Sequence, residues 1–194
     1  MYDAYPMISN SVVSNNVSIS YRVIGAGPRD VFLIHGWMVS GAVYDDLIAA
    51  LDTEGLRLVV IDLRGSGRSG RPNDGYSIAQ YAADVLAVAD ALGSRSFVVV
   101  GHSMGGQIAQ WISATANDRV IGQVLLCPVP ASGIPLPADA RALFRNSAQN
   151  RSMQQTILGL ACKQLGDAER ERILDDAGGV APQCIEQAFD TWTA

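Results

Sequence analysis

Short apolar segments that alternate with longer amphipathic ones constrain the fold of this chain more than any other feature. Four such segments are rich in Val, Ile and Leu: Val31–Ile34, Leu58–Ile61, Phe97–Val100 and Val120–Leu126. Strands of a mainly parallel sheet have this composition because helices cover both of its faces. The stretches that follow the first three, around residues 42–51, 78–92 and 105–116, have helical spacing. The sequence therefore predicts right-handed strand–helix–strand crossovers and a three-layer α/β sandwich with buried strands.

Local turn and capping signals refine this prediction. Residues 7–13 and 17–23 are β-prone and flank Asn15-Asn16, which predicts an antiparallel hairpin before the parallel sheet. Ser77 is expected to cap the N-terminus of the helix over residues 78–92, and Gly93 to end it.

The character of the chain changes after Cys127. Four prolines follow at positions 128, 130, 135 and 137, and no further Val/Ile-rich segment appears. Helical patterns are predicted over residues 138–146, 153–165, 168–176 and 182–191. We therefore predict two parts: an α/β core over residues 1–127 and a helical cap over residues 128–194.

The sequence Gly101-His102-Ser103-Met104-Gly105 follows the third apolar segment directly and opens a predicted helix. A serine in a sharp strand-to-helix turn has its hydroxyl lifted clear of the sheet, as a nucleophile requires. Glycine at both ends of the motif removes Cβ atoms that would clash across the turn. The start of the helix adds partial positive charge beside the serine. We interpret the motif as a nucleophile elbow with Ser103 as the catalytic residue.

A second motif, His35-Gly36-Trp37, follows the first apolar segment. Acyl transfer needs two N–H donors directed at the developing oxyanion, and we assign them to the backbone amides of Trp37 and Met104. His35 is expected to brace this loop. His102 is expected to be structural, because neighbouring side chains at an elbow point apart.

From about residue 31 to residue 127, the chain resembles α/β-hydrolases of the esterase and cofactor-free haloperoxidase (perhydrolase) type. The resemblance rests on the segments Leu33–Trp37, Asp62–Ser69 and Gly101–Gly106. It implies a serine nucleophile, a two-amide oxyanion hole, no metal and no organic cofactor. The motifs are specific to the superfamily but not to a substrate.

The remainder of a catalytic triad is missing from the sequence. In this fold the triad follows the order Ser, then Asp or Glu, then His, but the chain's only histidines are His35 and His102. The family leads us to expect two more strands and a closing helix beyond residue 194. We therefore expect an incomplete α/β-hydrolase fold that has little or no turnover alone, with the acid and the base supplied from outside this chain.

Composition excludes several other functions. The formal net charge is −5 and the basic residues are scattered, which does not favour nucleic acid or an anionic membrane as a partner. The N-terminus does not resemble a signal peptide and no apolar run is long enough to span a membrane, so a cytoplasmic location is predicted. Cys127, Cys162 and Cys184 are widely spaced and expected in the core, on a strand and two helices. Trp111 and Trp192 are expected to pack against helices rather than to stack on a substrate.

Three hypotheses follow. The first is a serine hydrolase acting on a small-molecule carboxylic ester, with perhydrolysis as a further activity. The second is a non-catalytic binding protein that keeps the pocket. The third is a C–C bond or lactone hydrolase on the same scaffold. The sequence gives no indication of the oligomeric state.

Overall fold

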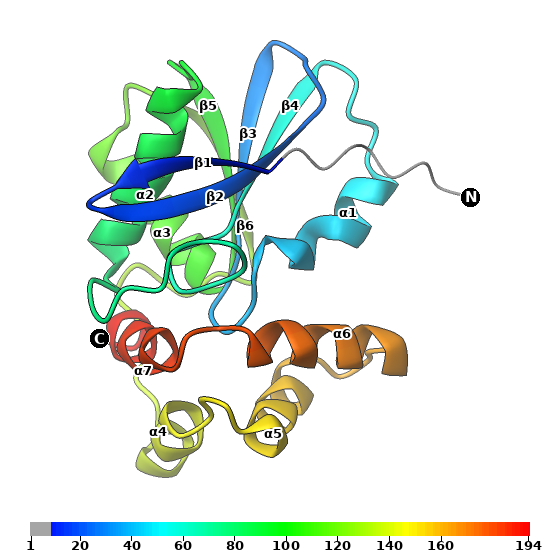
Figure 1. Cartoon of the computed structure of the whole chain (residues 1–194), viewed down its shortest axis with the longest axis vertical. Coiled ribbons are helices and arrows are strands. Elements are labelled where there is room, and N and C mark those ends of the chain that lie inside the picture. Colours follow the sequence, from blue (N-terminus) through cyan, green and yellow to red (C-terminus); the bar gives the residue numbers. More distant parts are fainter. Residues whose placement is uncertain (1–8) are drawn as a thin grey trace.

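The computed structural model describes residues 9–194, which contain a six-stranded sheet of order β1-β2-β4-β3-β5-β6 (Figure 1). The strands are β1 Ser9–Ser14, β2 Val17–Ile24, β3 Arg29–Ile34, β4 Leu56–Ile61, β5 Phe97–His102 and β6 Val120–Leu126. The pairs β3–β4, β3–β5 and β5–β6 are parallel. Strand β2 is antiparallel to both β1 and β4. This arrangement confirms the predicted mainly parallel sheet.

The N-terminal hairpin is confirmed within the described residues. Ser14 pairs with Val17, and the two residues between them, Asn15 and Asn16, have φ angles of 46° and 60°. A two-residue turn with positive φ at both positions matches the twist of the flanking strands, and asparagine tolerates it. Residues 7 and 8 of the predicted first strand lie outside the described residues.

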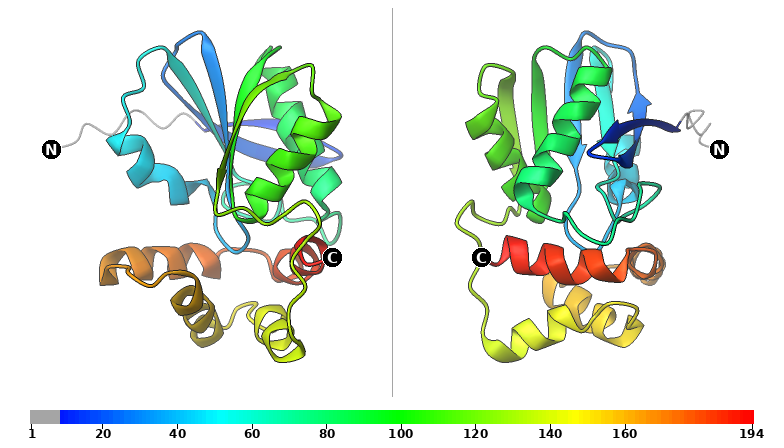
Figure 2. Two further views of the ribbon diagram at one scale, coloured as in Figure 1. Left: turned by 180° about the vertical axis from the view of Figure 1, so that it is seen from behind. Right: turned by 60° about the vertical axis from the view of Figure 1, so that its left-hand side comes forward.

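Helices cover both faces of the sheet. They are the short 3₁₀ helix η1 Gly41–Tyr44, α1 Asp45–Ala50, α2 Ile78–Ala91 and α3 Met104–Thr115. Alternate residues of β3 face opposite layers: Phe32 and Ile34 belong to the cluster that includes residues of α2 and α3, whereas Leu33 packs with Tyr44 of η1. Figure 2 shows the same layers from two further sides. The predicted three-layer sandwich is therefore confirmed.

The ends of α2 follow the predicted signals. The Ser77 hydroxyl accepts a hydrogen bond from the Gln80 amide at 3.2 Å, which satisfies one of the unpaired donors of the first turn. The helix ends at Ala91, and Gly93 has the positive φ of 66° typical of a helix stop.

Four helices follow β6 and lie beyond the carboxyl ends of the parallel strands (Figures 1 and 2). They are α4 Ala138–Arg145, α5 Arg151–Ala161, α6 Asp167–Gly178 and α7 Pro182–Trp192, and we refer to them as the cap helices. Helix α5 ends four residues before the predicted limit, because Cys162 has an extended backbone. The division into a core over residues 1–127 and a cap over residues 128–194 stays a prediction. No helix within residues 9–194 combines the length and apolarity needed to cross a membrane.

The expectation that β6 is a buried strand is wrong. Its Ile121 and Val124 side chains are 62% and 45% exposed, because β6 pairs with β5 on one side only within the described part of the chain. Trp111 on α3 is 47% exposed, so the expectation that it packs against helices is wrong, whereas Trp192 is buried as expected.

The expectation for the cysteines is correct only for Cys184, which is buried on α7. Cys127 and Cys162 are exposed because each follows the end of its element instead of lying within it.

Candidate active site

Ser103 occupies the junction between β5 and α3, with φ 55° and ψ −119°. Its amide donates to the Leu126 carbonyl of β6 at 3.0 Å, and its carbonyl accepts from the Gly106 and Val129 amides at 2.9 Å each. A positive φ is costly for a residue with a Cβ atom, so this conformation persists only where neighbouring contacts enforce it. The three hydrogen bonds supply such contacts and produce the sharp strand-to-helix turn.

Both outer glycines of the motif are required by close backbone contacts. A Cβ atom on Gly101 would lie 2.2 Å from the Gly105 carbonyl oxygen, and one on Gly105 would lie 2.1 Å from the Ile34 carbonyl oxygen. Neither clash involves a flexible side chain that could move away. The turn therefore depends on glycine at these two positions.

The loop that carries Gly36 lies against the elbow. The parallel pairing of β3 with β5 places Ile34 opposite Gly101, so the residues that follow the two strands meet at the same edge of the sheet. A Cβ atom on Gly36 would lie 3.1 Å from the Ser103 Cβ and 3.2 Å from the His102 Nδ1. The structure thus brings together two motifs that are far apart in the sequence.

The two amides assigned to the oxyanion hole belong to Trp37 and Met104. Met104 is buried at the N-terminus of α3, and Trp37 is half-buried in the loop after β3. Within residues 9–194 neither amide donates a hydrogen bond to another residue. Both amides, one in the residue after Ser103 and one in the residue after Gly36, are therefore free to donate to a developing oxyanion.

His35 uses both ring nitrogens inside the protein. Its Nε2 accepts a hydrogen bond from the Leu63 amide at 3.0 Å, so the proton resides on Nδ1, which donates to the Gly36 carbonyl at 2.7 Å. Burial lowers the pKa of His35, which keeps the ring neutral. The ring thus connects the loop at Gly36 to the segment that follows β4, as expected for a residue that braces the loop. Neither ring nitrogen is left free to accept a proton from Ser103.

His102 precedes the serine but is not hydrogen-bonded to it. Its Nδ1 is buried and has no hydrogen-bond partner among the described residues. Burial and the nearby His35 lower the pKa of His102. Within residues 9–194, therefore, neither histidine forms the hydrogen bond to Ser103 that a general base would make.

Comparison with known proteins places this arrangement in a family. Residues 31–164 match the model of the alpha/beta hydrolase fold. The chain belongs to this family. The matched region includes both motifs and extends into the cap helices.

Curated relatives in this family carry the names of enzymes. A non-heme chloroperoxidase of Streptomyces lividans is 39% identical over 121 residues, which is 60% of this chain and 43% of that protein. A bifunctional esterase/perhydrolase of Acinetobacter calcoaceticus is 42% identical over 108 residues, which is 54% of this chain and 39% of that protein. The matched part of the chain thus spans about two fifths of the length of these relatives.

A solved member of the hydrolase fold agrees over a longer range. The bromoperoxidase from Bacillus anthracis has a TM-score of 0.83 at 24% identity, over 95% of this chain and 74% of that chain. At this identity the likeness shows the fold alone, and it includes the cap helices.

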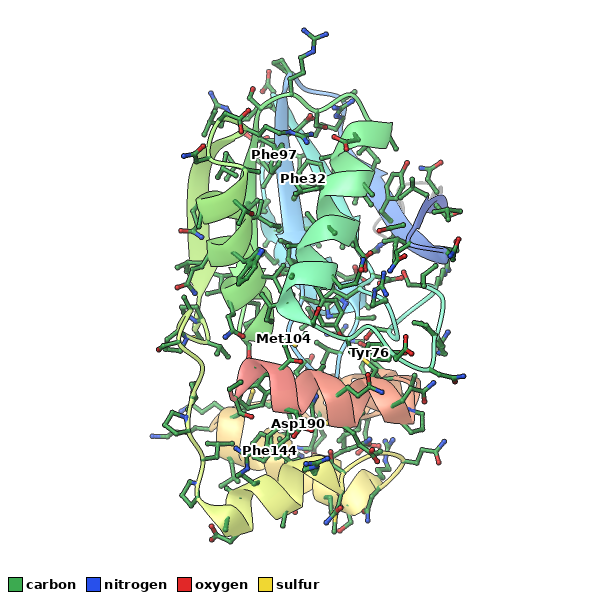
Figure 3. The ribbon with its side chains drawn as sticks, turned by 90° about the vertical axis from the view of Figure 1, so that its left-hand side faces the viewer. Phe32, Tyr76, Phe97, Met104, Phe144 and Asp190 are labelled. Atoms are coloured by element: carbon green, nitrogen blue, oxygen red, sulfur yellow. The ribbon has the colours of Figure 1, made fainter. Side chains whose placement is uncertain are left out.

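In this hydrolase fold the cap contacts the candidate oxyanion loop through an aromatic cluster of Trp37, Phe144, Phe189 and Trp192. The Trp37 ring stacks on Phe144 at 5.5 Å between centroids, and its Nε1 donates to the Ile185 carbonyl of α7 at 2.9 Å. Figure 3 shows Met104 at the end of the sheet facing α7, with Phe144 on the far side of that helix. This cluster is not predicted from the sequence, although Phe189 and Trp192 are spaced to share one helix face.

Asp62, the residue that follows β4, orders the turn after that strand. Its carboxylate accepts from the Arg68 amide at 3.0 Å and from the Gly41 amide at 2.9 Å, which orders the glycine-rich turn after β4. Across residues 9–194 no three His, Cys, Asp or Glu side chains are grouped as a metal ion would require.

Proposed function

We propose that the protein is a serine hydrolase that acts on a small-molecule carboxylic ester, with Ser103 as its nucleophile. The observation that carries the proposal is the strained Ser103 turn between β5 and α3, packed against Gly36. The amides of the residues that follow Ser103 and Gly36, Met104 and Trp37, donate to no other group within residues 9–194. Family membership supports ester chemistry at a coarse level, because the matched relatives include an esterase/perhydrolase.

In the proposed reaction the Ser103 Oγ attacks the carbonyl carbon of the ester while a base takes the hydroxyl proton. The carbonyl oxygen becomes an oxyanion, which the Trp37 and Met104 amides stabilise. Collapse of this intermediate breaks the bond to the alcohol, which leaves with the proton, and an acyl-enzyme remains. Water then attacks the acyl group and releases the acid. With hydrogen peroxide in place of water, the same acyl-enzyme yields a peracid.

The base and its acidic partner are proposed to lie outside these 194 residues. Both nitrogens of His35 are engaged and His102 makes no hydrogen bond to Ser103 within the described residues, so neither is suited to the task. A serine hydroxyl without a base is a weak nucleophile. Residues 1–194 alone are therefore expected to have little or no turnover.

The test compares the native protein, purified from its source, with its Ser103→Ala variant on p-nitrophenyl acetate, butyrate and hexanoate. We expect the native protein to hydrolyse at least one ester and the variant to lose at least about 10³-fold in kcat/KM. A variant that retains the native rate would exclude Ser103 as the nucleophile. A native protein that binds the esters without turnover would favour the non-catalytic alternative.

A further inference from the structure

The oxyanion loop, Gly36–Gly41, contains a residue in a strained conformation. Met38 has φ 65°, the left-handed region that a bulky side chain rarely adopts, and its side chain is buried. Such a residue keeps its conformation only when the surrounding structure over-determines it. The contacts that hold the loop therefore decide where the Trp37 amide points.

Two of these contacts come from the cap helices. At one end of the loop, the Trp37 Nε1 donates to the Ile185 carbonyl of α7. At the other end, the amide of buried Ser40 donates to the Asp176 carboxylate of α6 at 2.6 Å. The next amide, that of Gly41, is held by Asp62, which belongs to the core. The strained Met38 thus lies between two anchors that both belong to the cap.

The Asp176 anchor is a specific contact rather than a by-product of close packing. A cavity of about 220 Å³ adjoins Asp176 between α6 and η1, lined in part by Val39, Val43 and Ile173. Apolar packing is therefore incomplete here, and a charge-assisted hydrogen bond is the stronger constraint on the loop. Asp176 also lies in the last turn of α6, where the helix dipole disfavours a negative charge, so the N–H donor of Ser40 offsets an unfavourable interaction there.

We infer that Asp176 and the Trp37 indole are positioning residues that clamp the oxyanion loop to the cap, so that the Trp37 amide is aligned only when the cap is seated. Neither side chain reacts with substrate in this account. The catalytic consequence of the clamp rests on the proposed function, whereas the clamp itself does not.

The neighbouring Asp175 provides a matched control. It lies on the same turn of α6, but its carboxylate pairs with Arg151 of α5 at 2.8 Å, a contact within the cap. Removing Asp175 changes the charge by the same amount and leaves the loop anchors in place. Asp176→Asn is a second control, because the amide oxygen of asparagine can still accept from Ser40.

The first measurement is amide hydrogen exchange of the native protein and its variants. In Asp176→Ala, residues 37–41 should exchange at least about tenfold faster, whereas Asp176→Asn and Asp175→Ala should stay within about twofold of wild type. Amide exchange in strand β5 is the control for folding, because it stays at the wild-type rate in a folded variant. Unchanged exchange in residues 37–41 of a folded Asp176→Ala variant would overturn the clamp. If that variant unfolds, Trp37→Phe replaces it, since it keeps a six-membered aromatic ring and loses the Nε1 donor together with the pyrrole ring. An unchanged loop would again overturn the inference.

The second measurement uses ester hydrolysis by the native protein. An oxyanion hole acts in the transition state, so Asp176→Ala should lower kcat about 10- to 100-fold with KM within about threefold. Asp176→Asn should restore most of kcat, and Asp175→Ala should have none of this effect. Equal losses in the Asp175 and Asp176 variants would overturn the inference. If the wild-type protein hydrolyses no ester, the proposed function fails while the exchange result still decides the clamp.

Discussion

The elbow and the oxyanion loop form two halves of one candidate site, but they are held in different ways. Ser103 is fixed by backbone contacts to Leu126 and Val129 and by the glycine packing beneath it. The oxyanion loop is instead anchored by Ile185 and Asp176 of the cap helices. The proposed nucleophile is thus positioned by the core and the segment directly after β6, whereas the alignment of one proposed oxyanion donor depends on the cap.

The largest loss of stability is expected from a substitution within the elbow itself. Gly105→Ala places a Cβ atom 2.1 Å from the Ile34 carbonyl oxygen, so the β5–α3 turn must shift. We expect a loss of about 3 kcal/mol, the upper end of the usual range for an overpacked site, in the free energy of unfolding of residues 1–194, measured by urea denaturation. The control is Gly159→Ala on cap helix α5, where nothing lies within 4 Å; a helical alanine should stabilise by about 0.5–1 kcal/mol. A loss below about 1 kcal/mol for Gly105→Ala would show that the elbow tolerates a Cβ.

The next effect concerns the two histidines near the point where the halves meet. Burial holds the pKa of His35 below its ordinary value of 6.5, and the pKa of His102 is lowered in the same way. The unfolded chain therefore takes up protons more readily than the folded one. The contribution of the neutral rings to the free energy of unfolding is therefore fully present above about pH 6.5. It is lost as the pH falls, by up to about 1.4 kcal/mol per pH unit for each ring.

Urea denaturation at pH 7.5, 6.5 and 5.5 checks this pH dependence, and His102→Gln should reduce its slope. Stability that is constant or rises between pH 6.5 and pH 5.5 would contradict the buried neutral state of both rings.

A smaller effect measures the backbone strain at Ser103. Ser103→Gly accommodates φ 55° without a Cβ penalty, so it should raise the free energy of unfolding by about 1 kcal/mol. Ser103→Ala removes the same hydroxyl but keeps the Cβ, and it should stay within about 0.5 kcal/mol of wild type. Thermal or urea unfolding separates the two variants. A glycine variant less stable than the alanine variant would argue against strain at this position.

The smallest effect on stability is expected from Trp37 in the oxyanion loop. Trp37→Phe loses the hydrogen bond to Ile185 and should cost about 1 kcal/mol. Trp111→Phe makes the same chemical change at a site that is 47% exposed, and it should cost less than about 0.5 kcal/mol. Equal costs in urea denaturation would mean that the indole contact with α7 contributes nothing to stability.

The features that could be predicted from the sequence are those encoded locally. Apolar runs such as Phe97–Val100 specify buried strands, Asn15-Asn16 specifies a turn with positive φ, and Ser77 specifies a helix start. The elbow belongs to the same class, because its strand, glycines and helix are contiguous in the sequence. Its position at the sheet edge beside Gly36 then follows from parallel pairing of the strands.

The features that could not be predicted depend on contacts between distant segments. The Ser40–Asp176 hydrogen bond joins residues 136 positions apart, and no local pattern marks either partner. The exposure of Ile121 could not be predicted either, since its apolar strand resembles a buried one and only the tertiary arrangement leaves that side open. The signal that could have pointed to the cap contact is the aromatic pair on α7, Phe189 and Trp192.

The most direct test of the central claim is fluorophosphonate labelling of the native protein, followed by mass spectrometry of the tryptic peptide Ser96–Arg119, which contains Ser103. An activated serine in a preformed elbow should be modified at Ser103, and the Ser103→Ala variant should remain unlabelled. Absence of the adduct on a native protein that hydrolyses esters, or an adduct on another residue, would contradict the account.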